Sequence, residues 1–218
     1  MNLAASIDHT LLRPNSTLSE IARLCEEAKE YSFAAVCVSP YFVKRSVDFL
    51  ADSPVKVTTV IGFPNGYSTT AAKVEEIKRA LNDGADEVDV VINVSAVKDK
   101  NWHYVANDIE STTMAVHLRG KVIKIILETG LLEKEEVLRL CQICEKAGVN
   151  YVKTSTGFNG EGATVEIVKL LRQNLSEDIR IKASAGIRSA QTATKLLEAG
   201  ASRLGTSASI AIMSQLSS

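Results

Sequence analysis

Short β-branched runs alternate with amphipathic helical patterns from one end of this sequence to the other. Eight strand–helix units follow one another with short joints and without a linker. Such a series of crossovers forms either an open parallel sheet or a closed barrel. Eight units in 218 residues favour an α/β fold of the closed (β/α)8 type, a TIM barrel, as a single domain over residues 1–218. An open sheet is the alternative, although the G-x-G-x-x-G turn is absent after the first strand.

Turn residues and capping patterns set the boundaries of these units. Thr17 and Glu20 form a capping box before one helix, while Gly84 and Gly148 each end another. The predicted strands are Ser6–Asp8, Ala34–Ser39, Lys56–Ile61, Glu87–Ile92, Val122–Leu127, Tyr151–Lys153, Ile179–Ser184 and Arg203–Gly205. The predicted helices are Thr17–Tyr31, Pro40–Leu50, Thr70–Asp83, Trp102–His117, Lys134–Lys146, Ala163–Gln173, Ser189–Glu198 and a last helix after Gly205.

Composition argues against several classes of partner. The chain carries 25 basic and 26 acidic residues without a basic face, so no nucleic-acid partner is expected. No segment approaches the ~20 apolar residues of a membrane span, so no membrane association is expected. Met1–Arg13 lacks an apolar signal core, and the four cysteines are unevenly spaced. Together these features predict a cytoplasmic protein.

Cys141 and Cys144 form a Cys-x-x-Cys pattern that admits a zinc or redox interpretation. With Val137 and Leu140 they follow the i, i+3, i+4, i+7 spacing of a buried helix face. No second cysteine or histidine pair offers the remaining ligands of a zinc site. Packing in the core is therefore the favoured interpretation, and no metal is expected.

Two lysines at strand ends are the strongest candidates for chemistry. Lys153 follows Tyr151 and Val152 in a β pattern, and a glycine-rich turn comes after it. From this stretch alone, a salt-bridged or snorkelling lysine is the more common explanation. Lys182, however, repeats the same setting one strand–helix unit later. A buried ammonium is costly to desolvate, and a lysine that loses its proton forms Schiff bases with carbonyl substrates.

Further charged residues are expected on the same inner face. Side chains alternate along a strand, so Asp89 on the fourth strand and Lys124 on the fifth are predicted to point inward with the two lysines. Active-site groups of TIM barrels collect at the C-terminal ends of the strands. Asp8, Thr10 and Glu128 also lie at or just beyond strand ends, where structural hydrogen bonding and catalysis are both open.

Loops of small residues form a candidate anion site. In TIM barrels a phosphate commonly binds the loops after the seventh and eighth strands, beside a helix N-terminus. Those loops contain Gly186, Gly205 and Ser207 here, and small residues let the backbone approach a ligand. Gly157, after the sixth strand, is expected to complete the site. A tight turn that only caps the last helix is the alternative.

These motifs together resemble the 2-deoxyribose-5-phosphate aldolases, a family of class I, Schiff-base aldolases, over nearly the whole chain. The matching segments are Ile7–Leu12, Ala35–Val38, Val60–Pro64, Gly84–Asp89, Val152–Phe158, Lys182–Arg188 and Arg203–Ser207. The set is specific, because both lysine motifs and the Asp89 motif occur together in the family's order. One departure is Ala185-Gly186, where the family usually has two glycines; the extra methyl is expected to alter phosphate approach slightly.

The resemblance implies a lyase that reversibly cleaves 2-deoxy-D-ribose 5-phosphate to D-glyceraldehyde 3-phosphate and acetaldehyde, without a cofactor. It assigns Lys153 as the Schiff-base lysine, and Asp89 with Lys182 as the proton-transfer pair. Supporting roles are expected for Asp8, Thr10, Cys37, Lys124 and Thr154. The resemblance also implies a homodimer and a place in deoxyribose phosphate catabolism.

Two other function classes stay open from the residues themselves. A non-covalent isomerase or epimerase of phosphorylated sugars would need a carboxylate–histidine pair at strand ends, where His9 is the single histidine available. A non-catalytic phosphate binder would leave the inward-facing charges unexplained.

Overall fold

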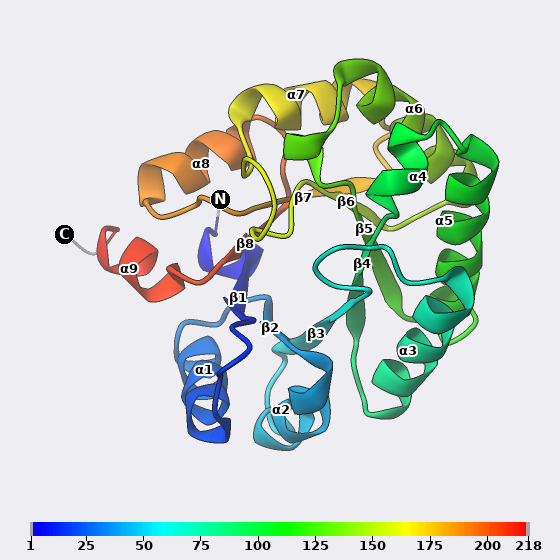
Figure 1. Ribbon diagram of the computed structural model, residues 1–218. Helices are drawn as coiled ribbons and strands as arrows, with labels where there is room; N and C mark the ends of the chain where they lie inside the picture. Colours follow the sequence, from blue (N-terminus) through cyan, green and yellow to red (C-terminus); the bar gives the residue numbers. More distant parts are fainter. Residues whose placement is uncertain (1, 217–218) are drawn as a thin grey trace.

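The computed structural model describes residues 2–216, which form a closed barrel of eight parallel strands. The strands are β1 (Ile7–Leu11), β2 (Ala35–Val38), β3 (Lys56–Ile61), β4 (Glu87–Val91), β5 (Val122–Ile126), β6 (Tyr151–Lys153), β7 (Arg180–Ser184) and β8 (Arg203–Thr206). They pair in chain order, and β8 closes the barrel against β1, with Asp8 opposite Gly205. Helices surround the strands (Figure 1). The predicted (β/α)8 fold is confirmed, and the open sheet is excluded.

The helices match the predicted alternation, with local differences. They are α1 (Leu18–Glu30), α2 (Val43–Phe49), α3 (Thr70–Asn82), α4 (Val94–Lys98), α5 (Trp102–His117), α6 (Lys134–Ala147), α7 (Val165–Asn174), α8 (Ala190–Glu198) and α9 (Ser209–Ser214). Short 3-10 turns cover Ala4–Ser6, Pro40–Phe42 and Thr129–Leu131. The helix expected from Pro40 therefore begins as a 3-10 turn. The sequence did not predict α4, which is only five residues long and is capped by the Asn93 side chain.

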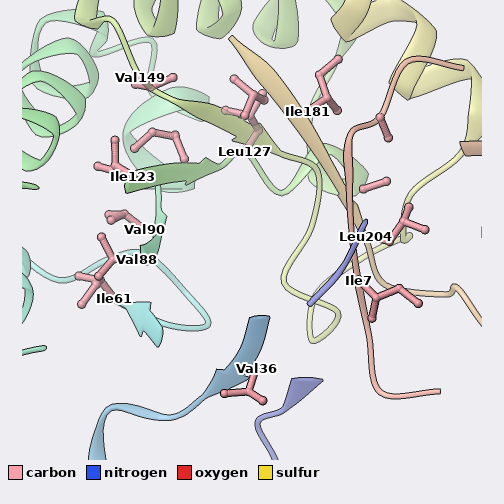
Figure 2. Close-up of a cluster of buried hydrophobic side chains, with 14 of the residues drawn as sticks. Ile7, Val36, Ile61, Val88, Val90, Ile123, Leu127, Val149, Ile181 and Leu204 are labelled. Carbon is pink, nitrogen blue, oxygen red and sulfur yellow. The ribbon is translucent and has the colours of Figure 1, made fainter. Parts of the chain in front are cut away.

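Alternate residues of each strand face outward and pack against the helices. Because side chains alternate, the residues between them face the barrel interior. The outward layer includes the strand residues Ile7, Val36, Ile61, Val88, Val90, Ile123, Ile181 and Leu204. Leu127, just after β5, and Val149, just before β6, belong to the same buried cluster, which Figure 2 labels. Burial of one such side chain contributes roughly 1.5–3 kcal/mol. This layer provides the hydrophobic core, which leaves the interior available for polar groups.

Cys141 and Cys144 lie on α6 as buried free thiols. Burial raises the pKa of Cys141 to about 12, so this thiol stays neutral near pH 7. The core-packing interpretation of the Cys-x-x-Cys pattern is confirmed. Within residues 2–216, no cluster of three or more His, Cys, Asp or Glu is arranged to hold a metal ion. Over the same residues, no helix has the length and apolar content to cross a membrane.

Candidate active site

Charged side chains occupy the barrel interior, where branched apolar residues usually pack in a TIM barrel. The interior carboxylates are Asp8, Glu87 and Asp89, and the interior cations are Lys124, Lys153, Lys182 and Arg203. The side chain of Arg203 is 13% exposed, and the other six are more deeply buried. Buried charges are tolerated when they pair with one another, so the pairing pattern decides what each group can do.

Asp89, on β4, stands at the centre of this cluster. Its Oδ2 accepts hydrogen bonds from the Nζ of Lys153 at 2.9 Å and from the Nζ of Lys182 at 2.8 Å. Its Oδ1 accepts one from Lys124 at 2.8 Å. Burial alone would raise the pKa of Asp89, but the three ammonium groups outweigh it and hold that pKa well below its usual 3.8. The predicted convergence of Asp89, Lys124, Lys153 and Lys182 is confirmed.

Lys182 is held between two carboxylates. Besides Asp89, its Nζ donates a short hydrogen bond to Asp8 Oδ2 from β1. Burial by itself would lower the pKa of Lys182, yet Asp8 and Asp89 reverse the effect and raise it above its usual 10.5. Lys182 therefore remains a cation at neutral pH.

Glu87, Tyr151 and Arg203 complete the cluster below Asp89 and were not singled out from the sequence as site residues. Glu87 forms an ion pair with Lys124 at 2.6 Å, and Arg203 pairs with Asp8 at 2.6 Å and with Glu87 at 3.4 Å. The phenol ring of Tyr151 lies 5.6 Å from the Arg203 guanidinium. A usable signal was present, because Glu87 shares the inward face of its strand with Asp89.

Lys153 is the least paired of the interior cations. It shares one carboxylate oxygen with Lys182, whereas Lys182 contacts two carboxylates and Lys124 three. Four interior cations face three carboxylates, so one ammonium is in excess. Lys153 makes the fewest ion pairs of the four, so its amine is the one least engaged by carboxylates. The geometry thus distinguishes Lys153 from Lys182, which their strand-end positions could not do.

A cavity of about 890 Å³ opens at the C-terminal ends of the strands. Of the seven interior charged residues, Lys153 is the one that lines it. The predicted residues on its wall are Thr10, Gly157, Gly186, Gly205 and Ser207. Asp8, Asp89, Lys124 and Lys182 lie behind Lys153, away from the cavity surface. A ligand in the cavity would therefore meet the amine of Lys153 before any other interior charge.

Two threonines that follow Lys153, Thr154 and Thr156, differ in their surroundings. Thr154, for which a supporting role is expected, donates its Oγ1–H to the Ser184 carbonyl at 3.2 Å and accepts from the Ser184 N–H at 3.1 Å. This hydroxyl links β6 to β7 and does not line the cavity. Thr156, two residues further, does line it. Cys37 is fully buried beside the cluster, and burial raises the pKa of its thiol.

The loops of small residues are tightly fitted. A side chain at Gly205 would place its Cβ 3.0 Å from both Lys182 Cε and Ser184 Cβ, so this position accepts only glycine without displacing Lys182. Ala185, the departure noted in the sequence, has φ 71°, in the region that favours glycine. Its methyl would lie 3.3 Å from a Cβ at Gly157, so the methyl faces the loop after β6.

His9 lies on β1 with its ring outside the charged interior. Its Nδ1 lies 2.9 Å from Ser209 Oγ, and its Nε2 lies 2.8 Å from Glu27 Oε2. This order resembles a hydrolase triad, but Ser209 is fully buried and does not line the cavity, so it cannot meet a substrate. Burial lowers the pKa of His9, although Glu27 opposes the effect. We interpret the group as a link between α1, β1 and α9.

Comparison with known families identifies this arrangement. The family model of DeoC/LacD family aldolases matches residues 3–214. The chain belongs to the DeoC/LacD aldolase family. That match spans all eight strands, and it includes every interior charged residue described above.

Relatives of this aldolase chain cover nearly all of its length. A deoxyribose-phosphate aldolase from Thermoanaerobacter sp. (strain X514) is 50% identical over 216 residues, which are 99% of this chain and 97% of that protein. A crystal structure from Coccidioides immitis is 43% identical and covers all of this chain and 86% of its own, with a TM-score of 0.95. A tetrameric deoxyribose phosphate aldolase from Aeropyrum pernix is 31% identical over 99% of this chain and 91% of its own, with a TM-score of 0.92.

The buried carboxylates predict acid sensitivity. Burial would raise the pKa of Asp8, but Lys182, Arg203 and Lys124 outweigh it, so the pKa of Asp8 is lowered, as is that of Asp89. A carboxylate with a lowered folded-state pKa stabilises the fold above its usual pKa of 3.8, and the contribution is lost as pH falls below that value. We expect urea midpoints to fall steeply below about pH 4. Asp8→Asn should flatten this decline, and an unchanged slope in that variant would contradict the assignment.

Proposed function

We propose that this protein is a class I aldolase that reversibly cleaves 2-deoxy-D-ribose 5-phosphate to D-glyceraldehyde 3-phosphate and acetaldehyde. One observation carries the proposal: Lys153 is the interior charged residue that lines the cavity, and its Nζ donates to Asp89, which also accepts from the cation Lys182. The substrate is further supported by relatives of that name at about half sequence identity over nearly the full chain.

The first half of the reaction forms an electron sink. Neutral Lys153 attacks C1 of the open-chain sugar, and the resulting carbinolamine loses water to give an iminium ion. Removal of the C3 hydroxyl proton then breaks the C2–C3 bond. The bonding electrons move to the iminium nitrogen, so glyceraldehyde 3-phosphate leaves and an enamine of acetaldehyde stays on Lys153. The iminium supplies the electrophile, and the route proposed here requires no metal or cofactor.

Asp89 and Lys182 carry out the proton transfers of this reaction. Asp89 Oδ2 contacts both lysine nitrogens, so it holds Lys153 in place and connects it to Lys182. Water in the cavity carries protons between this pair and the C3 hydroxyl, and later delivers one to the enamine carbon. Hydrolysis of the final iminium releases acetaldehyde and restores Lys153. Asp8 and Lys124 act by fixing the charges of Lys182 and Asp89.

The phosphate of the substrate is assigned to the loops after β6, β7 and β8. Gly157, Gly186, Gly205 and Ser207 line the same cavity as Lys153, and α9 begins directly after the last loop. Arg188, on the loop after β7, is exposed on the cavity wall and has no ion-pair partner among residues 2–216. Its guanidinium is free to pair with the phosphate.

Loss of Arg188 should weaken phosphate recognition selectively. We expect Arg188→Gln to raise KM for deoxyribose 5-phosphate about tenfold, the effect of one charged hydrogen bond, and Ser207→Ala to raise it less. Neither change should affect unphosphorylated deoxyribose. Steady-state kinetics on both sugars provide the measurement, with Arg119→Gln on the surface as the matched control. Equal effects on the two sugars would argue against this phosphate site.

The reaction class is tested by trapping. Incubation with acetaldehyde and borohydride should add one ethyl group to the protein by intact mass, and the purified protein should release glyceraldehyde 3-phosphate from deoxyribose 5-phosphate. A non-covalent isomerase would show neither result. If trapping occurs but another phosphorylated sugar is cleaved much faster, the chemistry stands and the substrate assignment fails.

Assembly and location belong to the same proposal. We expect a homodimer, and the tetrameric relative from Aeropyrum pernix supports self-association in this family. Met114 and Leu118, both exposed on or beside the end of α5, are candidates for the contact. Light scattering on the purified protein measures its mass directly. The four cysteines are free thiols, which supports a reducing, cytoplasmic location.

A further inference from the structure

Glu128 follows β5 in an unusual backbone conformation. Its φ is 58°, in the left-handed region that side chains other than glycine rarely adopt, and the residue is 1% exposed. Such a conformation persists when the surroundings fix it, and it often marks a functional site. Among residues 2–216, no lysine or arginine lies within ion-pair distance of Glu128, so only hydrogen bonds compensate the buried carboxylate.

Both carboxylate oxygens of Glu128 are used on one residue of the neighbouring loop. Oε1 accepts from the Thr156 N–H at 3.0 Å, and Oε2 accepts from the Thr156 hydroxyl at 2.5 Å. The same hydroxyl oxygen accepts from the Phe158 N–H at 3.1 Å. The chain of bonds therefore fixes three consecutive residues, from Thr156 through Gly157 to Phe158, and all three line the cavity.

The residues that flank Glu128 hold the strand that carries Lys153. The Leu127 N–H donates to the Lys153 carbonyl and the Thr129 N–H to the Thr154 carbonyl, both at 2.9 Å. These bonds continue the pairing of β5 with β6, which lie side by side (Figure 1). On the other side, Thr154 is bonded to Ser184 of β7. Ser155 is held by hydrogen bonds with Ser184 and Glu161, and Glu128 then holds Thr156, the next residue of this segment.

We propose that Glu128 is a positioning residue that sets the distance between the Schiff-base nitrogen of Lys153 and the phosphate loops. This inference rests on the proposed function. The Glu128 carboxylate contacts Thr156 and does not itself line the cavity. It therefore acts through the part of the cavity wall formed by Thr156–Phe158. That wall faces Ala185 of the β7 loop, because a Cβ at Gly157 would lie 3.3 Å from the Ala185 methyl. A displaced wall would misalign a substrate held at both ends.

Comparing kcat/KM for phosphorylated and unphosphorylated sugars distinguishes this positioning role from an effect on the stability of the whole protein. A substrate anchored at its phosphate needs Lys153 at a fixed distance, and a misplacement of about 1 Å can cost up to a hundredfold in rate. Unphosphorylated deoxyribose lacks that anchor. We expect Glu128→Gly and Thr156→Val each to lower kcat/KM for deoxyribose 5-phosphate about tenfold or more, and to change the value for deoxyribose less than about threefold. Glycine suits φ 58°, so Glu128→Gly removes the carboxylate without backbone strain.

Two controls complete the experiment. Thr156→Ser keeps both hydrogen bonds and should retain the parent ratio between the two sugars. The double variant Glu128→Gly with Thr156→Val should be no less active than the less active of the two single variants, because each single change already removes the bond between the Thr156 hydroxyl and Glu128. Equal losses on both sugars, additive losses, or a Thr156→Ser variant as impaired as Thr156→Val would overturn the inference. If the parent protein cleaves neither sugar, the proposed function fails and this inference fails with it. If the parent is active but the variants keep its ratio of kcat/KM between the two sugars, this inference alone is refuted.

Discussion

Lys153→Leu is expected to abolish borohydride trapping and to lower kcat/KM for deoxyribose 5-phosphate by about 10⁴-fold or more, since it removes the nucleophile. The fold should be retained. Without Lys153 the interior contains three cations and three carboxylates, and Asp89 keeps its contacts with Lys124 and Lys182. Far-ultraviolet circular dichroism and urea unfolding check the fold, while intact mass checks the trapping.

Lys182→Leu is the matched comparison. Lys182 does not line the cavity, so its loss should leave the adduct on Lys153. Trapping should become slower, because Lys182, the proton-transfer partner that shares Asp89 Oδ2 with Lys153, is lost. Peptide mapping of the reduced adduct in the parent protein decides the assignment. An adduct on Lys182 would reverse the two roles.

Asp89→Asn is expected to reduce both stability and activity. The carboxylate contacts Lys124, Lys153 and Lys182, and its neutralisation would leave four buried cations with two carboxylates. Removal of one partner from a buried ion-pair network costs about 3–5 kcal/mol. Urea unfolding at pH 7 measures this loss. We also expect kcat to fall at least about a hundredfold, because proton transfer and the placement of Lys153 both depend on Asp89.

Asp48→Asn provides the control for the stability measurement. Asp48 pairs with Arg45 at 3.6 Å, and both side chains are more than half exposed. Solvent screens such a pair, so its loss should change the free energy of unfolding by less than about 1 kcal/mol. A similar change in the free energy of unfolding for Asp89→Asn and Asp48→Asn would contradict the prediction that the buried ion pairs of Asp89 contribute more to stability than an exposed pair.

The sequence determined the architecture because hydrophobic periodicity is a local property. Strand and helix periods, the capping box at Thr17 and the glycine that ends α6 are each set within a few residues. Eight repeats favoured a closed barrel over an open sheet, and the pairing of β8 with β1 decided between them. Strand alternation likewise predicted that Asp89, Lys124, Lys153 and Lys182 share the interior. The one-turn helix α4 was missed, since five residues give too little periodicity to detect.

The division of labour among these charges was decided by tertiary structure alone. Ion pairing and burial depend on side chains brought together from different strands, and no local pattern records them. Only the closed barrel shows that Lys182 lies between Asp8 and Asp89 while Lys153 faces the cavity. It likewise shows that the Thr154 hydroxyl is bonded to β7, and that Glu128 reaches Thr156. The residue types follow from the sequence, but the partners of each follow from the closure of the barrel, because charge pairing acts through space and not along the chain.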